Sequence, residues 1–262
     1  LSGKWKYKIS ASNSDFDFVE YGPNAYPSLL YNDMVNPLVG LSMQGVIWYQ
    51  GENNTNRAKE YYHLFPAMIN DWRKKWGKDF PFYWVQLANY MDAVEVPSES
   101  LWAQVREAQT QTLSLSHTGQ AVIIDIGEAK DIHPKNKQEV GRRLALHALH
   151  NDYGFSDVVC ESPMPKTVRR VQDKIVVQFD NVADGLIVKN KYGYLMSFAV
   201  AGNDGVYKWV QAKVAGKDRV VLSCPDVIDP VSVRYAWGDN PDDANLYNSV
   251  GLPATPFEIK IE

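Results

Sequence analysis

The stretch GVIWYQGENN, residues 45–54, decides the fold class, because a short apolar run ends there in a polar loop. The apolar half is bounded by a glycine and by polar residues, which is typical of a short buried strand. The following segment repeats apolar residues at helical spacing from Tyr61 to Trp76, and Gly77 predicts its end. A strand followed by a long amphipathic helix begins an alternating α/β pattern.

The same alternation extends in both directions from this stretch. Helical spacing is expected over residues 26–39, 98–115 and from about Lys137 to Tyr153, and two further strands are expected at Phe82–Leu87 and Ala121–Asp125. Strands and helices that alternate through short loops imply a mostly parallel sheet covered on both faces, a three-layer α/β arrangement.

The pattern changes near residue 160, where helical periodicity gives way to short β-type runs. Turn sequences such as Asp184-Gly185 separate many of these runs. The sequence therefore predicts a small all-β sandwich after the α/β part. The predicted strands are Lys174–Phe179, Leu186–Lys189, Leu195–Val200, Val206–Ala212, Arg219–Ser223 and Val231–Trp237.

Composition narrows the function classes. The chain has 262 residues, of which 45% are hydrophobic and 22% charged, as in ordinary globular proteins, and its net charge of −4 predicts no nucleic-acid partner. No apolar run approaches the ~20 residues that a membrane span requires. The two cysteines, Cys160 and Cys224, fit no metal-binding pattern, and their spacing leaves open one disulfide or two buried thiols.

Polar residues at the carboxyl end of the first strand are candidates for chemistry. Gln50, Gly51, Glu52, Asn53 and Asn54 combine amide side chains and a carboxylate around a glycine. Amide groups can stabilise an oxyanion and a carboxylate can orient a histidine. The alternative is a polar turn that caps the next helix.

A second candidate loop follows the Ala121–Asp125 run and reads Asp131-Ile132-His133-Pro134. A histidine at a strand-to-helix junction is well placed to act as a general base, although a lone loop histidine is more often only a surface residue. The other histidines are expected to be structural or solvated, namely His63, His117, His147 and His150.

Taken together, the motifs resemble the sialate O-acetylesterase family, a branch of the SGNH hydrolases. The resemblance starts with residues 45–54 and extends from about Tyr26 to the C-terminal region. The further matching blocks are Tyr61, Asp71-Trp72-Arg73, Phe80-Pro81-Phe82, Val85-Gln86-Leu87, Arg106-Glu107-Ala108-Gln109, Ile124-Asp125-Ile126-Gly127, residues 131–134 with Lys137, residues 233–237, Asn245-Leu246-Tyr247-Asn248, and residues 251–254 with Pro256 and Phe257.

The resemblance implies a role for each candidate residue. His133 resembles the catalytic base, and the block that shapes the oxyanion pocket corresponds to Gln50, Gly51 and Asn54. Many SGNH hydrolases carry an aspartate three residues before the histidine, where this sequence has Lys130. The acidic partner of His133 is therefore Glu52 or Asp131, and we favour Glu52.

One family feature is missing from the sequence. The Gly-Gln-Ser-Asn type motif that carries the family's nucleophile occurs nowhere in it, and the first residue is Leu. We therefore expect a C-terminal portion of a longer enzyme, with the serine outside this chain and little activity from the chain alone. The expected domains are the trailing end of an inserted β domain at residues 1–20, part of an SGNH-like hydrolase domain at 21–160, and a β-sandwich at 161–262.

The predicted function is serine-type hydrolysis of acetyl esters on sugars, without a metal or cofactor. The expected partners are an acetylated sialic acid or another acetylated glycan, with acetylxylan as an alternative, and the missing part of the same protein. The resemblance implies a secreted, periplasmic or lysosome-like compartment. Two other classes stay open: a glycosidase that pairs Glu52 with Asp125 or Asp131, and a non-catalytic carbohydrate-binding module that uses Trp209 or Trp237.

Overall fold

The computed structural model describes residues 22, 26 and 28–261, so the expected trailing end at residues 1–20 lies outside the described residues. The chain divides into two units, Leu1–Ser42 and Met43–Glu262. In the first unit, the helix expected over residues 26–39 is present as irregular turns: a π-helical stretch at Tyr31–Val35 is followed by a 3₁₀ turn at Asn36–Leu38. No described helix combines the length and apolar character needed to cross a bilayer.

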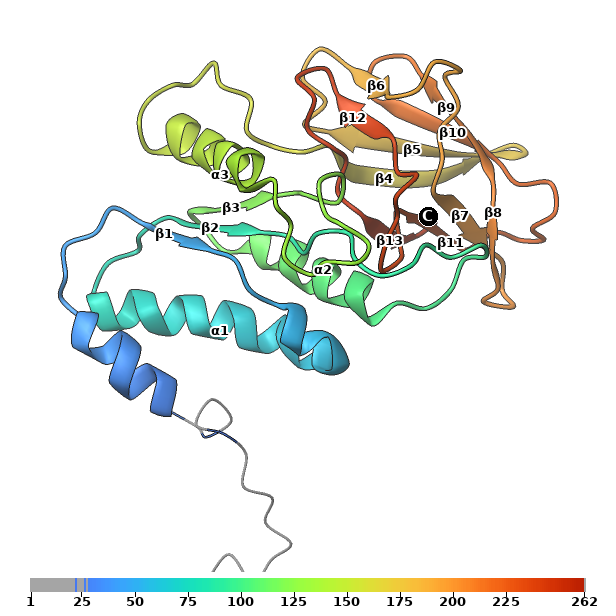
Figure 1. The fold of residues 1–262 in the computed structure, drawn as a ribbon. Helices are drawn as coiled ribbons and strands as arrows, with labels where there is room; N and C mark the ends of the chain where they lie inside the picture. Colours follow the sequence, from blue (N-terminus) through green and yellow to red (C-terminus); the bar gives the residue numbers. More distant parts are fainter. Residues whose placement is uncertain (1–21, 23–25, 27, 262) are drawn as a thin grey trace, which may run out of the picture. The chain divides into compact units, whose positions relative to one another are not determined.

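A parallel three-stranded sheet is the centre of the α/β part in the second unit. Its strands are β1 (Val46–Trp48), β2 (Phe82–Val85) and β3 (Thr118–Ala121), in the order β1-β2-β3. Trp48 pairs with Trp84, and Trp84 pairs in turn with Gln120. Because all three strands run the same way, the loops that follow them emerge at one edge of the sheet (Figure 1).

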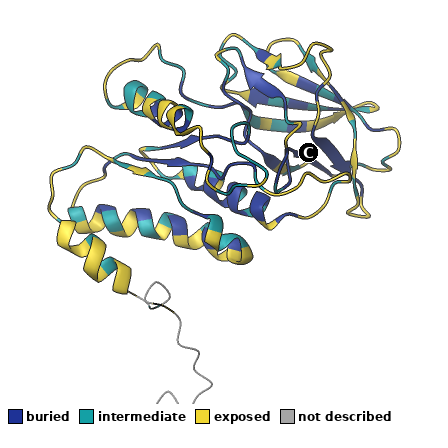
Figure 2. Cartoon of the chain, viewed as in Figure 1, coloured by how far each residue is buried: buried dark blue, intermediate teal, exposed yellow. Residues whose placement is uncertain are grey.

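Helices cover both faces of this sheet, as the alternating pattern predicts. The helices α1 (Ala58–Trp76) and α2 (Leu101–Gln111) lie on one face, and α3 (Lys137–Asn151) lies on the other (Figure 1). Phe65, Trp84 and Trp102 belong to the core between the sheet and the first two helices. Tyr83, Val85 and Leu144 belong to the core beneath α3. Buried residues face the sheet while the outer helix faces are exposed (Figure 2).

Antiparallel strands form the rest of the second unit, in agreement with the expected β-sandwich. One four-stranded sheet has the order β4-β5-β10-β9, the other has the order β13-β11-β7-β8, and β12 pairs with β6. Phe179, Phe198 and Phe257 pack in their shared core. The strands are β4 (Met164–Val171), β5 (Lys174–Asp180), β6 (Leu186–Val188), β7 (Phe198–Ala201), β8 (Tyr207–Trp209), β9 (Gln211–Ala215), β10 (Arg219–Ser223), β11 (Ser232–Tyr235), β12 (Leu246–Asn248) and β13 (Phe257–Lys260).

One predicted strand was wrong in position. The expected strand Ala121–Asp125 is largely an irregular segment, and β3 ends at Ala121. The apolar run is buried for another reason: Val122 and Ile124 belong to the sandwich core, while Ile123 belongs to the core under α3. The run therefore joins two cores, and its hydrophobicity reflects burial rather than strand pairing.

Cys160 and Cys224 are both buried and free. Of the two alternatives, one disulfide or two buried thiols, the structure therefore shows two buried thiols.

Candidate active site

The Gln50–Asn54 loop lies at the carboxyl end of β1 and is internally fixed. Gln50 Nε2 donates to Asn54 Oδ1 at 2.7 Å, and Tyr61 on α1 donates its hydroxyl hydrogen to the Gln50 backbone oxygen at 3.2 Å. Since the Asn54 oxygen accepts from Gln50, its amide nitrogen is directed elsewhere, and no described residue accepts from that nitrogen. A half-buried amide held in this way can donate to a developing oxyanion.

Gly51 allows the loop to approach α2 closely. Its φ is +152°, and a Cβ at this position would lie 3.3 Å from both Gln109 Nε2 and Leu87 Cδ2. Gln109, buried on α2, donates to the backbone oxygens of Gln50 and Val85 and accepts from the Leu87 backbone N–H at 3.0 Å. This one amide therefore joins the ends of β1 and β2. The sequence offers one signal for the role of Gln109, because a glutamine on the apolar face of an expected helix needs buried hydrogen-bond partners.

The second candidate loop presents an exposed imidazole. The His133 side chain is 87% exposed, and its Nδ1 lies 3.7 Å from Asp131 Oδ1. The His133 backbone N–H donates to the same carboxylate at 2.9 Å, so Asp131 also closes a local turn. The neighbours of His133 anchor the loop: Pro134 is buried, and Ile132 packs against the core shared by α1 and α2.

The identity of the acidic partner of His133 is still open. Asp131 is close to the ring, but 3.7 Å is longer than a hydrogen bond. Glu52 is half-buried at the start of a 3₁₀ turn (Glu52–Arg57), and its charge raises the pKa of Tyr49, although burial contributes more to that increase. No hydrogen bond or ion pair joins His133 to Glu52 or Gln50 within the described part of the chain.

A cation–π contact connects the two loops. Lys137, four residues after His133, places its Nζ 4.6 Å from the centre of the Tyr49 ring, and Tyr49 directly precedes Gln50. Neither residue was among the candidates drawn from the sequence, although Lys137 belongs to the matching motif. The contact supports a common site for the two loops.

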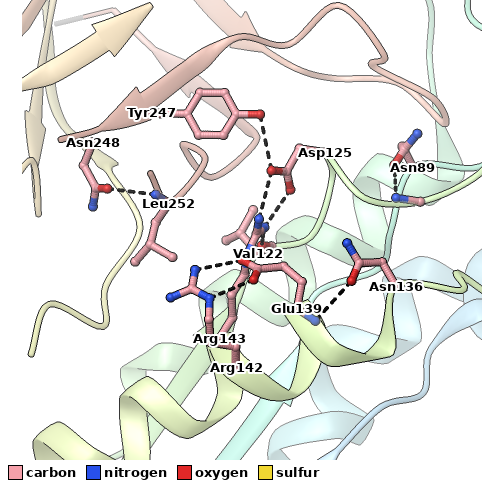
Figure 3. Close-up of polar contacts among 11 residues, drawn as sticks. Asn89, Val122, Asp125, Asn136, Glu139, Arg142, Arg143, Tyr247, Asn248 and Leu252 are labelled. Carbon is pink, nitrogen blue, oxygen red and sulfur yellow. Dashed lines mark hydrogen bonds and ion pairs between the residues drawn. The ribbon is translucent and has the colours of Figure 1, made fainter. Parts of the chain in front are cut away.

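A buried ion-pair network holds the segment that leads to His133 (Figure 3). Arg143 on α3 binds both carboxylate oxygens of Asp125, at 2.6 and 2.9 Å, and donates to Glu139 at 2.8 Å. Tyr247 from β12 also donates to Asp125, at 3.3 Å. Asp125 is thus engaged on both oxygens in a structural role, which counts against its use as half of a glycosidase pair.

A second hydrogen-bond chain holds this segment from the other side. Asn89, in the loop after β2, accepts from the Gly127 backbone N–H at 2.7 Å and donates to Asn240 at 2.9 Å. Met91 N–H donates to the Ala129 oxygen at 2.9 Å. The loop that carries His133 is therefore braced by the loop after β2, whose position depends in turn on the β-sandwich side of the unit.

One group of side chains has the composition of a metal site. Ligand atoms of His147, Cys160 and Glu161 lie within 4.8 Å of one another. Burial raises the pKa of Cys160 to about 11, with a further contribution from Glu161, so its thiol is protonated at neutral pH. His147 is fully buried with Nε2 at 3.1 Å from the Gln120 oxygen, and burial lowers its pKa. A structural histidine explains these contacts, and we assign no metal to them.

Comparison with known proteins decides the family. The family described as "Carbohydrate esterase, sialic acid-specific acetylesterase" matches residues 17–150. The chain belongs to this family. Sialate O-acetylesterases from Pongo abelii and Homo sapiens are each 30% identical over 264 residues, which cover 90% of this chain and 49% of the relative. The chain thus spans about half the length of the curated relatives it matches.

A solved structure extends the similarity to the three-dimensional fold. A carbohydrate acetylesterase from Xanthomonas citri superposes with a TM-score of 0.84 and is 45% identical, over 90% of this chain and 55% of that one. The expected fold class, a parallel α/β sheet followed by antiparallel β-sheets, is therefore confirmed. The domain boundaries and the roles of individual site residues remain predictions.

Proposed function

We propose that this chain provides the general base and the oxyanion-binding side of a carbohydrate O-acetylesterase. The observation that carries the proposal is the placement of the candidate groups. The fixed amides of Gln50 and Asn54 and the exposed imidazole of His133 lie on loops at the carboxyl edge of one parallel sheet, joined by the Lys137–Tyr49 contact. Family membership supports acetyl-ester hydrolysis as the reaction.

The proposed reaction proceeds through an acetyl-enzyme. A serine outside this chain attacks the acetyl carbonyl while His133 removes its proton, and the Gln50 or Asn54 amide stabilises the oxyanion of the tetrahedral intermediate. The protonated His133 then donates its proton to the departing sugar oxygen. Water, deprotonated by His133, finally attacks the acetyl group, and acetate leaves as its bond to the serine oxygen breaks and His133 returns the proton to that oxygen. Glu52 or Asp131 orients the imidazole through these steps.

The proposed substrates are acetylated sialic acids or other acetylated glycans, acetylxylan among them. The family description and the relatives' names support an acetylated sugar, and the compartment stays a prediction. A glycosidase that pairs Glu52 with Asp125 is disfavoured because Arg143 and Tyr247 engage Asp125.

An activity comparison tests the proposed location of the nucleophile. We expect the 262-residue chain alone to be close to inactive on 4-nitrophenyl acetate, and a longer protein that carries the Gly-Gln-Ser-Asn type segment to be active. Hydrolysis by the chain alone, abolished in a His133→Ala variant, would show that a serine within the chain is the nucleophile.

A further inference from the structure

A pocket of about 320 Å³ lies between the β-sandwich and the loop that follows β2. Its walls come from residues 93–95 of that loop, from residues 195–198 and 209–210, and from most of residues 236–243. None of the residues assigned above to acetyl-ester hydrolysis lines it. The pocket is therefore separate from the candidate active site and has no role in the proposed reaction itself.

Trp209 gives the pocket a surface suited to a sugar ring, and the largely buried Trp237 lies in the pocket wall. Trp209 is 43% exposed, and its Nε1 donates to the Glu95 backbone oxygen at 2.9 Å, which fixes the indole relative to the loop after β2. Trp237 is only 8% exposed, and its Nε1 has no acceptor among the described residues. Flat, rigid apolar faces with few polar groups nearby are characteristic of small-molecule sites, and the C–H face of a pyranose packs well on an indole.

The charges around the pocket restrict the class of sugar. Its lining includes three carboxylates, Glu95, Asp242 and Asp243, and the described lining residues include no Lys, Arg or His. Arg234, which lies over the Trp237 ring, is already paired with Glu99 and Glu258. Carboxylates accept hydrogen bonds from sugar hydroxyls but repel an anionic ligand. The lining therefore favours a neutral sugar over a sialic acid.

The pocket is connected to the candidate active site through a short chain of hydrogen bonds. Asn240, which lines the pocket, accepts from Asn89, and Asn89 accepts from the backbone N–H of Gly127, six residues before His133. Asn240 also donates to the Met91 oxygen at 2.8 Å. The loop after β2 thus contributes both to the pocket wall and to the support of the His133 loop.

From these observations we infer that the pocket is a subsite for a neutral pyranose unit of the glycan substrate. Its role as a subsite rests on the proposed esterase function. The binding of a neutral sugar in it does not, so the two proposals can fail independently.

Titration of the 262-residue chain with sugars tests the subsite. Two neutral probes, xylotriose and lactose, and one anionic probe, N-acetylneuraminic acid, are followed by the shifts of the tryptophan indole N–H signals in NMR spectra. We expect saturable binding of at least one neutral probe with a Kd on the order of 1 mM, and binding of the anionic probe that is weaker by roughly tenfold or more.

Variants assign the binding to the pocket. Trp209→Ala is expected to weaken binding of the neutral probe by roughly tenfold, whereas Trp209→Phe, which keeps a ring, is expected to retain most of it. Tyr192→Ala is the matched control, because this aromatic side chain is 69% exposed in the same sandwich but does not line the pocket. Replacing Glu95 by Gln and Asp242 by Asn is expected to reduce the difference in affinity between the neutral probes and the anionic probe.

The inference would be overturned if neither neutral probe showed saturable binding up to about 50 mM, a concentration well above the millimolar Kd expected. It would also be overturned if the Trp209→Ala variant bound the neutral probe as tightly as the original chain. Equal affinities for the neutral and anionic probes would overturn it as well. Sugar binding without esterase activity in the longer protein would refute the proposed function, and with it the pocket's role as a subsite, but not the binding of a neutral sugar in the pocket. Esterase activity without sugar binding in the pocket would refute only the subsite.

Discussion

At the scale of single residues, the candidate site combines groups that are held firmly with one that is not. Gln50 and Asn54 are fixed by hydrogen bonds, and Gly51 is favoured because its φ strains other residues and a Cβ would make tight contacts with Gln109 and Leu87. His133, by contrast, extends into solvent. An exposed imidazole loses orientation unless a carboxylate or a covering segment holds it, so the choice between Glu52 and Asp131 has a measurable consequence.

Amide substitutions separate the two carboxylates. In the longer protein that carries the proposed serine, Glu52→Gln is expected to lower kcat/KM strongly, by up to about 10⁴-fold, if Glu52 orients the imidazole. Asp131→Asn is expected to cost less than about tenfold, because an Asn oxygen can still accept from the His133 backbone N–H and preserve the turn. The reverse order of effects would assign the orienting role to Asp131.

At the scale of elements, the sequence predicts a helix or strand correctly where the spacing of apolar residues and the residues that end the segment indicate the same element. The helix ending at Gly77 is confirmed as α1, and Gly77 caps it at φ +61°. The strand at Phe82 and the helix at Lys137 begin where they were expected. Three of the misjudged segments, residues 118–121, 164–171 and 206–212, share one cause, which is that tertiary burial overrides local pattern.

The strand β3 shows this cause most clearly. Thr118–Ala121 contains Gly119 and Gln120 and has the composition of a loop, yet both residues are buried in the sheet. Gly119 is needed because a Cβ there would lie 2.5 Å from His147 Nδ1, and Gln120 accepts from the buried Trp84 indole at 3.0 Å. These partners come from distant segments, so the sequence gives no local signal of them.

The two other cases lie in the sandwich. Met164–Val171 carries one proline, Pro165, and three basic residues yet forms β4, because β5 pairs with it along most of its length. The expected run Val206–Ala212 is divided between β8 and β9, which belong to different sheets. The same limit applies to the candidate site: the motifs include Gln109, but the hydrogen bonds by which Gln109 and Asn89 hold the site's loops together emerge only from the fold.

The ion pairs of Glu139 within α3 predict a stability that depends on pH. Hydrogen bonds from Arg142 and then Arg143, together with their charges, lower the pKa of Glu139 to about 2 despite its partial burial. Because the folded-state pKa lies below the unfolded value, Glu139 stabilises the fold above about pH 4.5, and this contribution is lost as pH falls toward 2.

Glu139→Gln is therefore expected to reduce the free energy of unfolding by about 0.5–1.5 kcal/mol at pH 7, because solvent screens the pair with the half-exposed Arg142, and to have progressively less effect toward pH 3. Urea unfolding at several pH values measures this difference. Glu60→Gln is the control, since Glu60 forms only an exposed ion pair at 3.7 Å. A Glu139 effect that is constant with pH would contradict the assignment.

At the scale of the second unit as a whole, Arg106 connects the α/β part to the sandwich. This fully buried arginine of α2 donates to the backbone oxygens of Leu87, Ala88, Gly238 and Asp239. Burial lowers its pKa to about 9, opposed by Asp239, so the guanidinium remains charged at neutral pH. Its four acceptors belong to the loop after β2 and to the segment after β11.

Arg106→Gln is expected to destabilise the fold by about 3 kcal/mol or more, because several buried carbonyl oxygens lose their donors. Arg57→Gln, at an exposed ion pair, is expected to change stability by no more than about 0.5 kcal/mol. Unfolding followed by circular dichroism measures both. Equal stability of the two variants would show that this connection contributes little to the fold.

The central claim is that His133 acts as the general base, and a matched pair of histidines tests it most directly. His117 is also exposed, lies beside a carboxylate, with its Nδ1 3.1 Å from Asp79, and directly precedes β3 at the opposite end of the sheet. Both histidines are replaced by Asn, which tolerates the φ of +50° at His117. We expect His133→Asn to lower kcat/KM of the longer protein on an acetylated sugar by about 10²–10⁴-fold, and His117→Asn to leave it within about twofold. Comparable kcat/KM values for the two variants would contradict the assignment of His133 as the base.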